Sequence, residues 1–144
     1  MDFILVGGVA AILEGAPVST FDLDVVFLPT EENRQRLLAA LGDLNARYLD
    51  PAGRHIVPDA EKLASLRLHQ LLTDHGPLDV LRTIGHGLGY SELVEHTREH
   101  RVEGLPVRTL SLEMIILSKE QAQRDKDRAA LPVLRRTLEL RKKV

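Results

Sequence analysis

The sequence of 144 residues contains no cysteine and no tryptophan, and only 3% of its residues are aromatic. Without cysteine the chain forms neither disulfides nor thiolate metal sites, which fits a reducing compartment such as the cytoplasm. The low aromatic content argues against a surface on which successive nucleic-acid bases stack. No apolar run reaches the roughly 18–20 residues that a membrane-spanning helix needs. We therefore expect a cytoplasmic protein with no membrane partner.

An excess of positive charge is also missing, because the formal net charge is −2. Proteins that bind long nucleic acids by releasing counterions usually carry a strong basic excess. Only the end of the chain, "RRTLELRKKV", is locally basic, and we interpret it as a solvated helix face. The length, with 44% hydrophobic and 28% charged residues, is typical of one globular domain with a real core.

The order of apolar patterns and turn residues predicts an α/β (α+β) domain with a mixed β-sheet. A sheet-containing core is expected over about residues 1–110, and C-terminal helices over about 111–144. The last helix carries Pro132, which should kink or restart it. Strands are predicted at 3–6 and 21–28, as a pair within 68–84, and as a hairpin over 100–110 with Gly104 in its turn. Helices are predicted at 9–15, 31–49, 60–66, 91–97, 112–122 and from about 125.

Two aspartates interrupt an apolar run in "TFDLDVVFLPT". Asp22 and Asp24 are two residues apart, so in a strand their side chains project to the same face. Two neighbouring carboxylates repel each other, and burying either one alone is unfavourable. A divalent cation compensates such a pair best, and oxygen ligands suit Mg²⁺ or Mn²⁺. The pair therefore indicates a metal site.

Two further segments can complete such a site. Asp79 in "GPLDVL" is a lone acid in another apolar strand, and three converging carboxylates are enough for two-metal transfer chemistry. In "LVGGVA", a strand is followed by Gly7, Gly8 and the start of a helix. Glycines let the backbone approach a phosphate, and a helix N-terminus offers unpaired N–H groups. This combination predicts a phosphate-binding turn beside the acids.

The stretch "VGGVAAILEGAPVSTFDLDVVF" resembles the signature of the nucleotidyltransferase superfamily with the polymerase-beta-like fold. That signature is a hydrophobic strand, Gly-Gly or Gly-Ser, a short helix and Asp-x-Asp in a strand. "PLDVL" resembles the segment of the third acid, and "SKEQAQRDKDRAAL" resembles a late helix with a lysine and then a Lys-Asp pair. Small toxin-type members from abortive-infection systems often show "T-x-D-L-D", which here spans residues 20–24.

The resemblance implies the nucleotidyltransferase fold and metal-dependent transfer of a nucleoside monophosphate from an NTP, such as ATP, to an acceptor hydroxyl. The acceptor stays open between RNA or tRNA, a protein and a small molecule. A role in a toxin–antitoxin system would add a cognate antitoxin or partner protein. The implied residues are Asp22, Asp24 and Asp79 for catalysis and the metal, and Gly7, Gly8, Thr20 and Lys119 for the nucleotide.

Other interpretations remain open at this point. The chain could be a non-catalytic nucleotidyltransferase-like binding or regulatory module, because Val9 stands where many members carry Ser or Thr and no helix precedes the first strand. "FDLD" also opens the haloacid-dehalogenase-type phosphatase motif, although "VVF" follows here instead of Gly-Thr. His96 and His100 have a spacing that can ligate zinc on a helix, without an obvious third ligand. The segment "GHGLG" is a surface loop or a phosphate loop.

Overall fold

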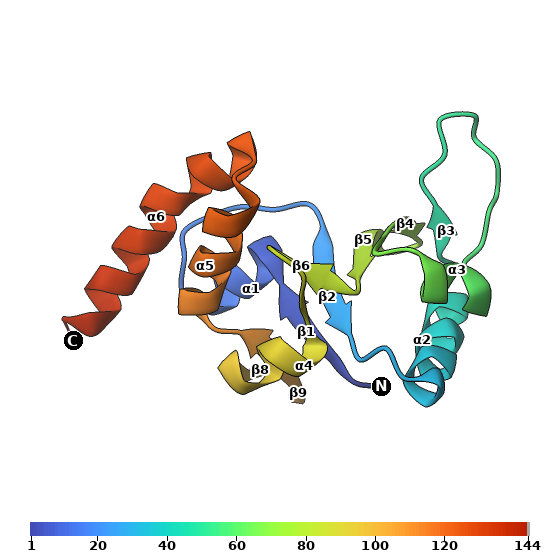
Figure 1. Cartoon of the computed structure of the whole chain (residues 1–144), viewed down its shortest axis with the longest axis horizontal. Helices are drawn as coiled ribbons and strands as arrows, with labels where there is room; N and C mark the ends of the chain where they lie inside the picture. The colour runs from blue at the N-terminus through green and yellow to red at the C-terminus, as the bar shows by residue number, and fades with distance from the viewer. Residues whose placement is uncertain (144) are drawn as a thin grey trace.

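The computed structural model describes residues 1–143, which form a seven-stranded mixed sheet with helices at both of its ends (Figure 1). The strand order is β3-β4-β5-β2-β1-β9-β8. The strands of this sheet are β1 (Phe3–Val6), β2 (Leu23–Phe27), β3 (Arg47–Tyr48), β4 (Leu68–Thr73), β5 (Gly76–Leu81), β8 (Thr97–Val102) and β9 (Leu105–Leu110). A separate two-stranded sheet pairs β6 (Thr83–Ile84) with β7 (Leu88–Gly89). The helices are α1 (Gly7–Leu13), α2 (Glu31–Asp43), α3 (Ala60–Ser65), α4 (Tyr90–Leu93), the 3₁₀ helix η1 (Val94–His96), α5 (Leu112–Ala122) and α6 (Asp125–Lys142).

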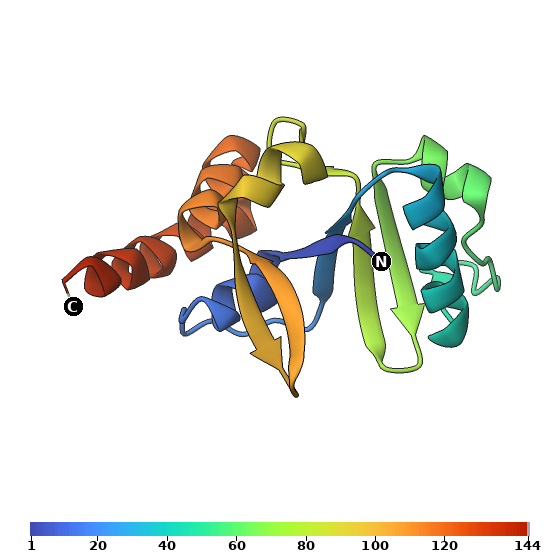
Figure 2. The same ribbon diagram turned by 90° about the horizontal axis from the view of Figure 1, so that it is seen from below.

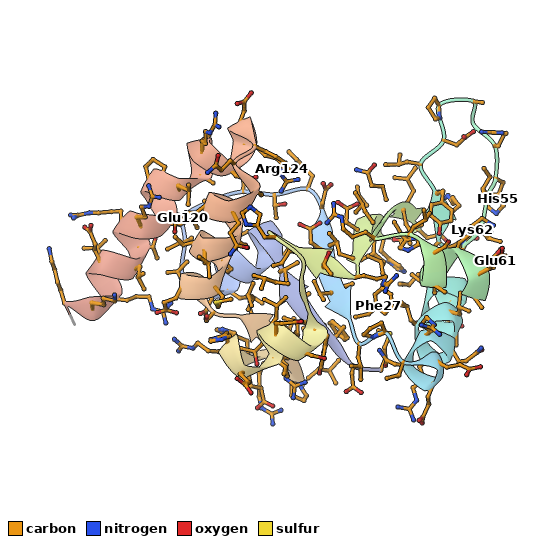
Figure 3. The ribbon with its side chains drawn as sticks, in the orientation of Figure 1. Phe27, His55, Glu61, Lys62, Glu120 and Arg124 are labelled. Atoms are coloured by element: carbon orange, nitrogen blue, oxygen red, sulfur yellow. The ribbon has the colours of Figure 1, made fainter. Side chains whose placement is uncertain are left out.

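The centre of the sheet is built from segments far apart in the sequence. β1 runs antiparallel to β2, and β2 runs parallel to β5. On the other side of β1, β9 is its parallel neighbour. Ile4, Val26, Phe27 and Val80 from these strands are completely buried, and Figure 3 labels Phe27 in this region. The mixed sheet predicted from the sequence is therefore confirmed.

Side chains cap two helices where the sequence predicts that helices begin. Thr30 Oγ1 accepts a hydrogen bond from the amide of Asn33 at 3.2 Å, at the start of α2. Ser111 Oγ accepts one from the amide of Met114 at 3.3 Å, at the start of α5. Each cap satisfies one of the amide groups that have no partner in the first turn of a helix.

The helix predicted over 31–49 is too long, because α2 ends at Asp43. Asn45 has a left-handed φ of 52°, and the amide of Ala46 bonds to the carbonyl of Leu41 at 2.9 Å. This is a Schellman-type helix end, for which asparagine is the usual substitute for glycine. Arg47–Tyr48 then pairs with β4 at the edge of the sheet.

Several other predicted boundaries differ from the structure, among them that of the hairpin expected over 100–110, whose first strand β8 already begins at Thr97. The strand expected over 21–28 is shorter, so Asp22 lies just before β2. The segment 85–90, predicted as a loop, includes β7. Helix α6 neither ends nor restarts at Pro132, which lies inside it. A proline inside a helix removes one amide donor and its ring clashes with the carbonyl four residues earlier, so a kink at Pro132 stays a prediction.

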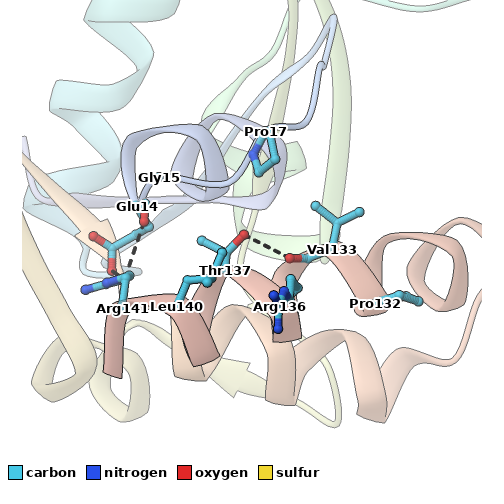
Figure 4. Close-up of a pocket in the computed structure, with 9 residues that line it drawn as sticks. All are labelled: Glu14, Gly15, Pro17, Pro132, Val133, Arg136, Thr137, Leu140 and Arg141. Atoms are coloured by element: carbon cyan, nitrogen blue, oxygen red, sulfur yellow. Dashed lines mark hydrogen bonds and ion pairs between the residues drawn. The ribbon is translucent and has the colours of Figure 1, made fainter. Parts of the chain in front are cut away.

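The helices divide into two groups along the sheet (Figure 2). α2 and α3 lie beside β3 and β4, whereas α1, α5 and α6 lie at the end that contains β1, β8 and β9. α6 reaches beyond the sheet, and a groove of 730 Å³ separates it from the segment that follows α1 (Figure 4). Within residues 1–143, no helix combines the length and the apolar character that crossing a bilayer requires.

Candidate active site

Asp24 and Asp79 face each other across the junction of two parallel strands. They are paired residues in the register of β2 and β5. Because paired residues of adjacent strands project to the same face, both carboxylates point into one pocket. The pocket has a volume of 350 Å³ and is lined by residues of the sheet, of the Gly7 turn and of the α5–α6 corner. The predicted meeting of these two acids is therefore present in the structure.

Burial raises the pKa of both carboxylates, and their contact adds to the shift of Asp24. Burial raises the pKa of Asp24 to about 7, with further contributions from the charge and hydrogen bonding of Asp79 and from the charge of Asp22. Burial is also the main reason why the pKa of Asp79 is raised. Lys126 opposes both shifts through its positive charge. Two carboxylates this close tend to share one proton near neutral pH unless a cation binds them.

The donor set fits a divalent cation of the Mg²⁺ type. Among residues 1–143 no Lys, Arg or His forms an ion pair with Asp22, Asp24 or Asp79. Asp22 lies close enough to raise the pKa of both other acids, but it is exposed and does not line the pocket. No group of three acidic or histidine side chains within this range is close enough to hold a metal. The structure thus presents a pair of ligands, and Asp22 as third ligand stays a prediction.

The turn from β1 into α1 lies directly against the acid pair. Gly7 has a φ of 69°, and a Cβ at this position would overlap Oδ2 of Asp24. A Cβ on Gly8 would lie 2.7 Å from Cβ of Thr20. Thr20 Oγ1 in turn accepts a hydrogen bond from the amide of Asp22 at 3.3 Å. The two glycines therefore let the backbone approach both Asp24 and the loop that leads into β2.

We expect Gly7→Ala to destabilise the fold by about 1–2 kcal/mol through its left-handed backbone alone, and to displace Asp24 as well. Urea denaturation measures the first effect, and binding of Mg²⁺-NTP measures the second. Gly42→Ala is the matched control, because Gly42 lies in α2 and a Cβ there meets open space. This control should be neutral or stabilising by up to ~1 kcal/mol. Equal behaviour of the two variants would contradict the close packing of Gly7 on Asp24.

Positive side chains surround the side of the pocket opposite the sheet. Lys119 comes from α5, Arg124 from the turn between the last two helices and Lys126 from the first turn of α6. Figure 3 labels Arg124 at this corner, on the side toward the sheet. Arg67 and Gln70 add polar groups near β4. An anionic ligand between the acids and these cations would contact the cations on one side and a metal bound to the acids on the other.

The resemblance implied Lys119 for the nucleotide and included the Lys-Asp pair Lys126-Asp127, but it gave Arg124 no role. The structure brings all four to the pocket. Arg67 was missed, because an isolated arginine next to a predicted strand carries no recognisable pattern.

The hypothesis that His96 and His100 lie on one helix is wrong. His96 ends η1, whereas His100 lies in β8 and its Nε2 is 2.7 Å from Oε2 of Glu14.

The glycine-rich segment "GHGLG", residues 85–89, contacts α5, because the amide of His86 donates a hydrogen bond to Oε1 of Gln121 at 2.9 Å. Gly85 of that segment lines the pocket.

The sequence matches no family model, and no curated protein matches it. Solved structures do share its architecture. The lincosamide antibiotic adenylyltransferase LnuA, solved with lincomycin bound, matches with a TM-score of 0.58 at 16% identity over 93% of this chain and 85% of that one. The antibiotic-resistance factor ANT(2'')-Ia matches with a TM-score of 0.57 at 17% identity, over 95% and 75% of the two chains. TM1012 of Thermotoga maritima, a candidate nucleotidyltransferase, matches with a TM-score of 0.55 at 16% identity, over 91% and 80%.

These likenesses cover more than nine tenths of the chain. At such low identity they concern the path of the backbone and the arrangement of the elements. The nucleotidyltransferase fold expected from the sequence is thereby confirmed. The chain has the nucleotidyltransferase fold.

Proposed function

We propose that the protein transfers a nucleoside monophosphate from an NTP to an acceptor hydroxyl with release of pyrophosphate. The observation that carries this proposal is the pairing of Asp24 with Asp79 in one pocket whose opposite side is cationic. The likeness to solved nucleotidyltransferases supports it at the level of the fold. The signature that the sequence resembles has its acids in strands, and Asp24 and Asp79 lie in β2 and β5.

The residues of the pocket would have different roles in this reaction. Lys119, Arg124 and Lys126 would bind the phosphates and offset the charge that develops on the leaving pyrophosphate. The acceptor oxygen attacks the α-phosphorus, and the bond from that phosphorus to the bridging oxygen of the β-phosphate breaks. Asp79 would accept the proton that the acceptor hydroxyl loses. A Mg²⁺ ion held by Asp24 and Asp79 with Asp22, or Mn²⁺ in its place, would neutralise the phosphate oxygens and orient the attack.

Incubation with each α-labelled NTP and Mg²⁺ tests this activity. Total RNA, tRNA, the protein itself and hydroxylated antibiotics such as lincomycin serve as acceptors. We expect transfer of label with at least one pair, and loss of transfer when EDTA removes the metal. Asp43→Asn is the control variant, because Asp43 is an exposed acid at the end of α2 and should leave transfer unchanged. Nucleotide binding without transfer to any acceptor would favour the non-catalytic module instead.

The identity of the acceptor decides the biological role. LnuA was solved with a small-molecule antibiotic bound, which supports a small hydroxylated acceptor for this fold. Transfer to RNA or tRNA would instead support a cytoplasmic toxin with a cognate antitoxin, since the net charge of −2 still permits local contact with one RNA end. In that case, expression in bacteria should arrest growth with the intact Asp24–Asp79 pair and not with Asp24→Asn.

A further inference from the structure

Asp127 is a completely buried carboxylate at the third position of α6. Its Oδ2 accepts hydrogen bonds from the amide of Arg124 at 3.1 Å and from Nε of the same residue at 2.7 Å. Its Oδ1 lies 3.4 Å from Nζ of Lys119 and accepts a bond from Arg124 at 3.3 Å. One buried acid therefore connects α5 to the start of α6 and contacts two of the three cations at this side of the pocket.

Capping of α6 does not by itself explain this arrangement. Asp59 also caps a helix, because it accepts from the amide of Lys62 at 2.8 Å and from Nζ of the same residue at 2.8 Å, but it does so from an exposed position. Asp127 caps α6 while completely buried, and it contacts cations from two different elements. Burying a carboxylate is unfavourable unless strong partners compensate for the loss of water. Burial would raise the pKa of Asp127, but the Arg124 hydrogen bond and the charges of Lys119 and Arg124 lower it overall, so the group is ionised at neutral pH.

The two cations that Asp127 holds would otherwise be poorly fixed. Lysine and arginine side chains have several rotatable bonds, and ordering them on a bound anion is entropically unfavourable. The Arg124 side chain is 61% exposed, so packing does not fix it, whereas the Lys119 side chain is 18% exposed and its Nζ pairs with Asp127. An anchored cation has already lost part of that freedom before the ligand arrives.

We propose that Asp127 is a positioning residue that holds Lys119 and Arg124 in place for the β- and γ-phosphates of an NTP bound at the Asp24–Asp79 pair. This inference rests on the proposed function, because it needs a triphosphate in that pocket. Asp127 does not touch the nucleotide and acts only through the two cations. The α5–α6 corner is then a part of the binding site and more than a support for the sheet.

The sign of the change in affinity separates positioning from simple electrostatics. Asp127→Asn removes a negative charge, and this alone would strengthen the binding of an anionic triphosphate. Loss of positioning has the opposite sign, because both cations become mobile. An effect on folding alone would lower the number of binding sites per molecule without changing the affinity of those that remain.

Titration calorimetry with Mg²⁺ and a non-hydrolysable NTP analogue measures both quantities. We expect Asp127→Asn to weaken binding about 10-fold, on the scale of one charge-assisted hydrogen bond, with unchanged stoichiometry. Affinity for the corresponding NMP should change less than about 2-fold, because that ligand lacks the two phosphates. Asp125→Asn is the control, since Asp125 lies two residues earlier in α6 and is fully exposed. Unchanged or tighter NTP binding by Asp127→Asn would overturn the inference.

A second set of variants covers the case in which Asp127→Asn does not fold. Lys119→Met and Arg124→Met remove the positioned cations from pocket-lining positions. Each should weaken NTP binding and leave NMP binding unchanged, and unchanged NTP affinity in both would refute the role of Asp127. Wild-type protein that binds no nucleotide would overturn the proposed function together with this inference. Wild-type binding that Asp127→Asn retains would overturn the inference alone.

Discussion

Asp24→Asn and Asp79→Asn should each lower nucleotidyl transfer by about 10³-fold or more, without loss of the fold. Each substitution keeps the size of the side chain and removes one of the two charges that would hold the metal. The strands also lose a repulsion, so neither protein should be less stable than the wild type. Steady-state transfer of label from the preferred NTP measures the loss. Activity within about 10-fold of wild type in both variants would show that these acids are not the catalytic pair.

The same substitution at Asp24 should change how stability depends on pH. The pKa of Asp24 is about 7 in the folded protein, against 3.8 for an ordinary aspartate. Below pH ~3.8 both states hold the proton, and between there and pH ~7 only the folded state retains it. The free energy of unfolding of the metal-free protein should therefore fall as the pH rises through this window. Asp24→Asn should lack this fall, so it should match wild type at low pH and exceed it at pH 7.

Urea denaturation from pH 4 to pH 8, in the presence of EDTA, measures this difference directly. Asp43→Asn again serves as control, because it removes an exposed acid far from the pair in the sequence. Saturating Mg²⁺-NTP should narrow the difference at pH 7, since a ligand present at 100 times its dissociation constant adds about 2.7 kcal/mol to the protein that binds it. A pH-independent difference between Asp24→Asn and wild type would argue against a shared proton.

Much of the site was predictable because its signal is local. The order strand, Gly-Gly, helix, loop and Asp-x-Asp lies within 25 residues and fixes β1, α1 and β2. For Asp79, the residue pattern predicted only an acid within an apolar strand and did not predict where that strand lies in the sheet. Its pairing with Asp24 depends on β5 lying next to β2, and an apolar pattern carries no information about the neighbour of a strand. The family resemblance supplied that information.

The errors have equally specific causes. Helical periodicity continues past Asp43, so the sequence alone favoured a longer helix, yet Asn45 in a left-handed conformation ends it. An asparagine near a predicted helix end was the available signal. Asp22 was placed in the strand because "FDLD" is apolar on alternate residues. In the structure Phe21 is 92% exposed, so the buried part of the run begins only after the acids.

Buried charges are the feature that the sequence hides most completely. An acid at the start of a helix is usually a solvated cap, and nothing in "RDKD" distinguishes buried Asp127 from exposed Asp125. Glu14 is a similar case, since the sequence places it at the end of a short helix. Whether such a residue is buried depends on which distant segments cover it, and here these come from β8, α5 and α6.

Glu14 joins those segments through its carboxylate, which is 1% exposed. Oε1 accepts a hydrogen bond from the amide of Leu112 at 3.0 Å, at the first residue of α5. Oε2 lies 2.7 Å from Nε2 of His100 and 3.6 Å from Nε of Arg98, both in β8. Arg141 of α6 lies 3.6 Å from Oε1, and Figure 4 shows it facing Glu14 across the end of the groove. One side chain thus fixes the N-terminus of the helix that carries Lys119.

Glu14→Ala should destabilise the protein by about 3 kcal/mol, which combines loss of a helix cap with loss of a charge-assisted hydrogen bond. In thermal denaturation this corresponds to a midpoint lowered by about 10 °C for a chain of this size. Glu14→Gln should lower the free energy of unfolding by about half as much, because its amide oxygen can still accept a hydrogen bond from the amide of Leu112.

Glu113→Gln is the matched control, since it removes an exposed acid from the same first turn of α5, where the helix dipole contributes at most ~1 kcal/mol. The partly exposed His100, Arg98 and Arg141 regain water when the carboxylate is removed, so the loss should stay well below that of an orphaned buried charge. Equal midpoints for Glu14→Ala and Glu113→Gln would mean that apolar packing alone holds α5 and α6 on the sheet.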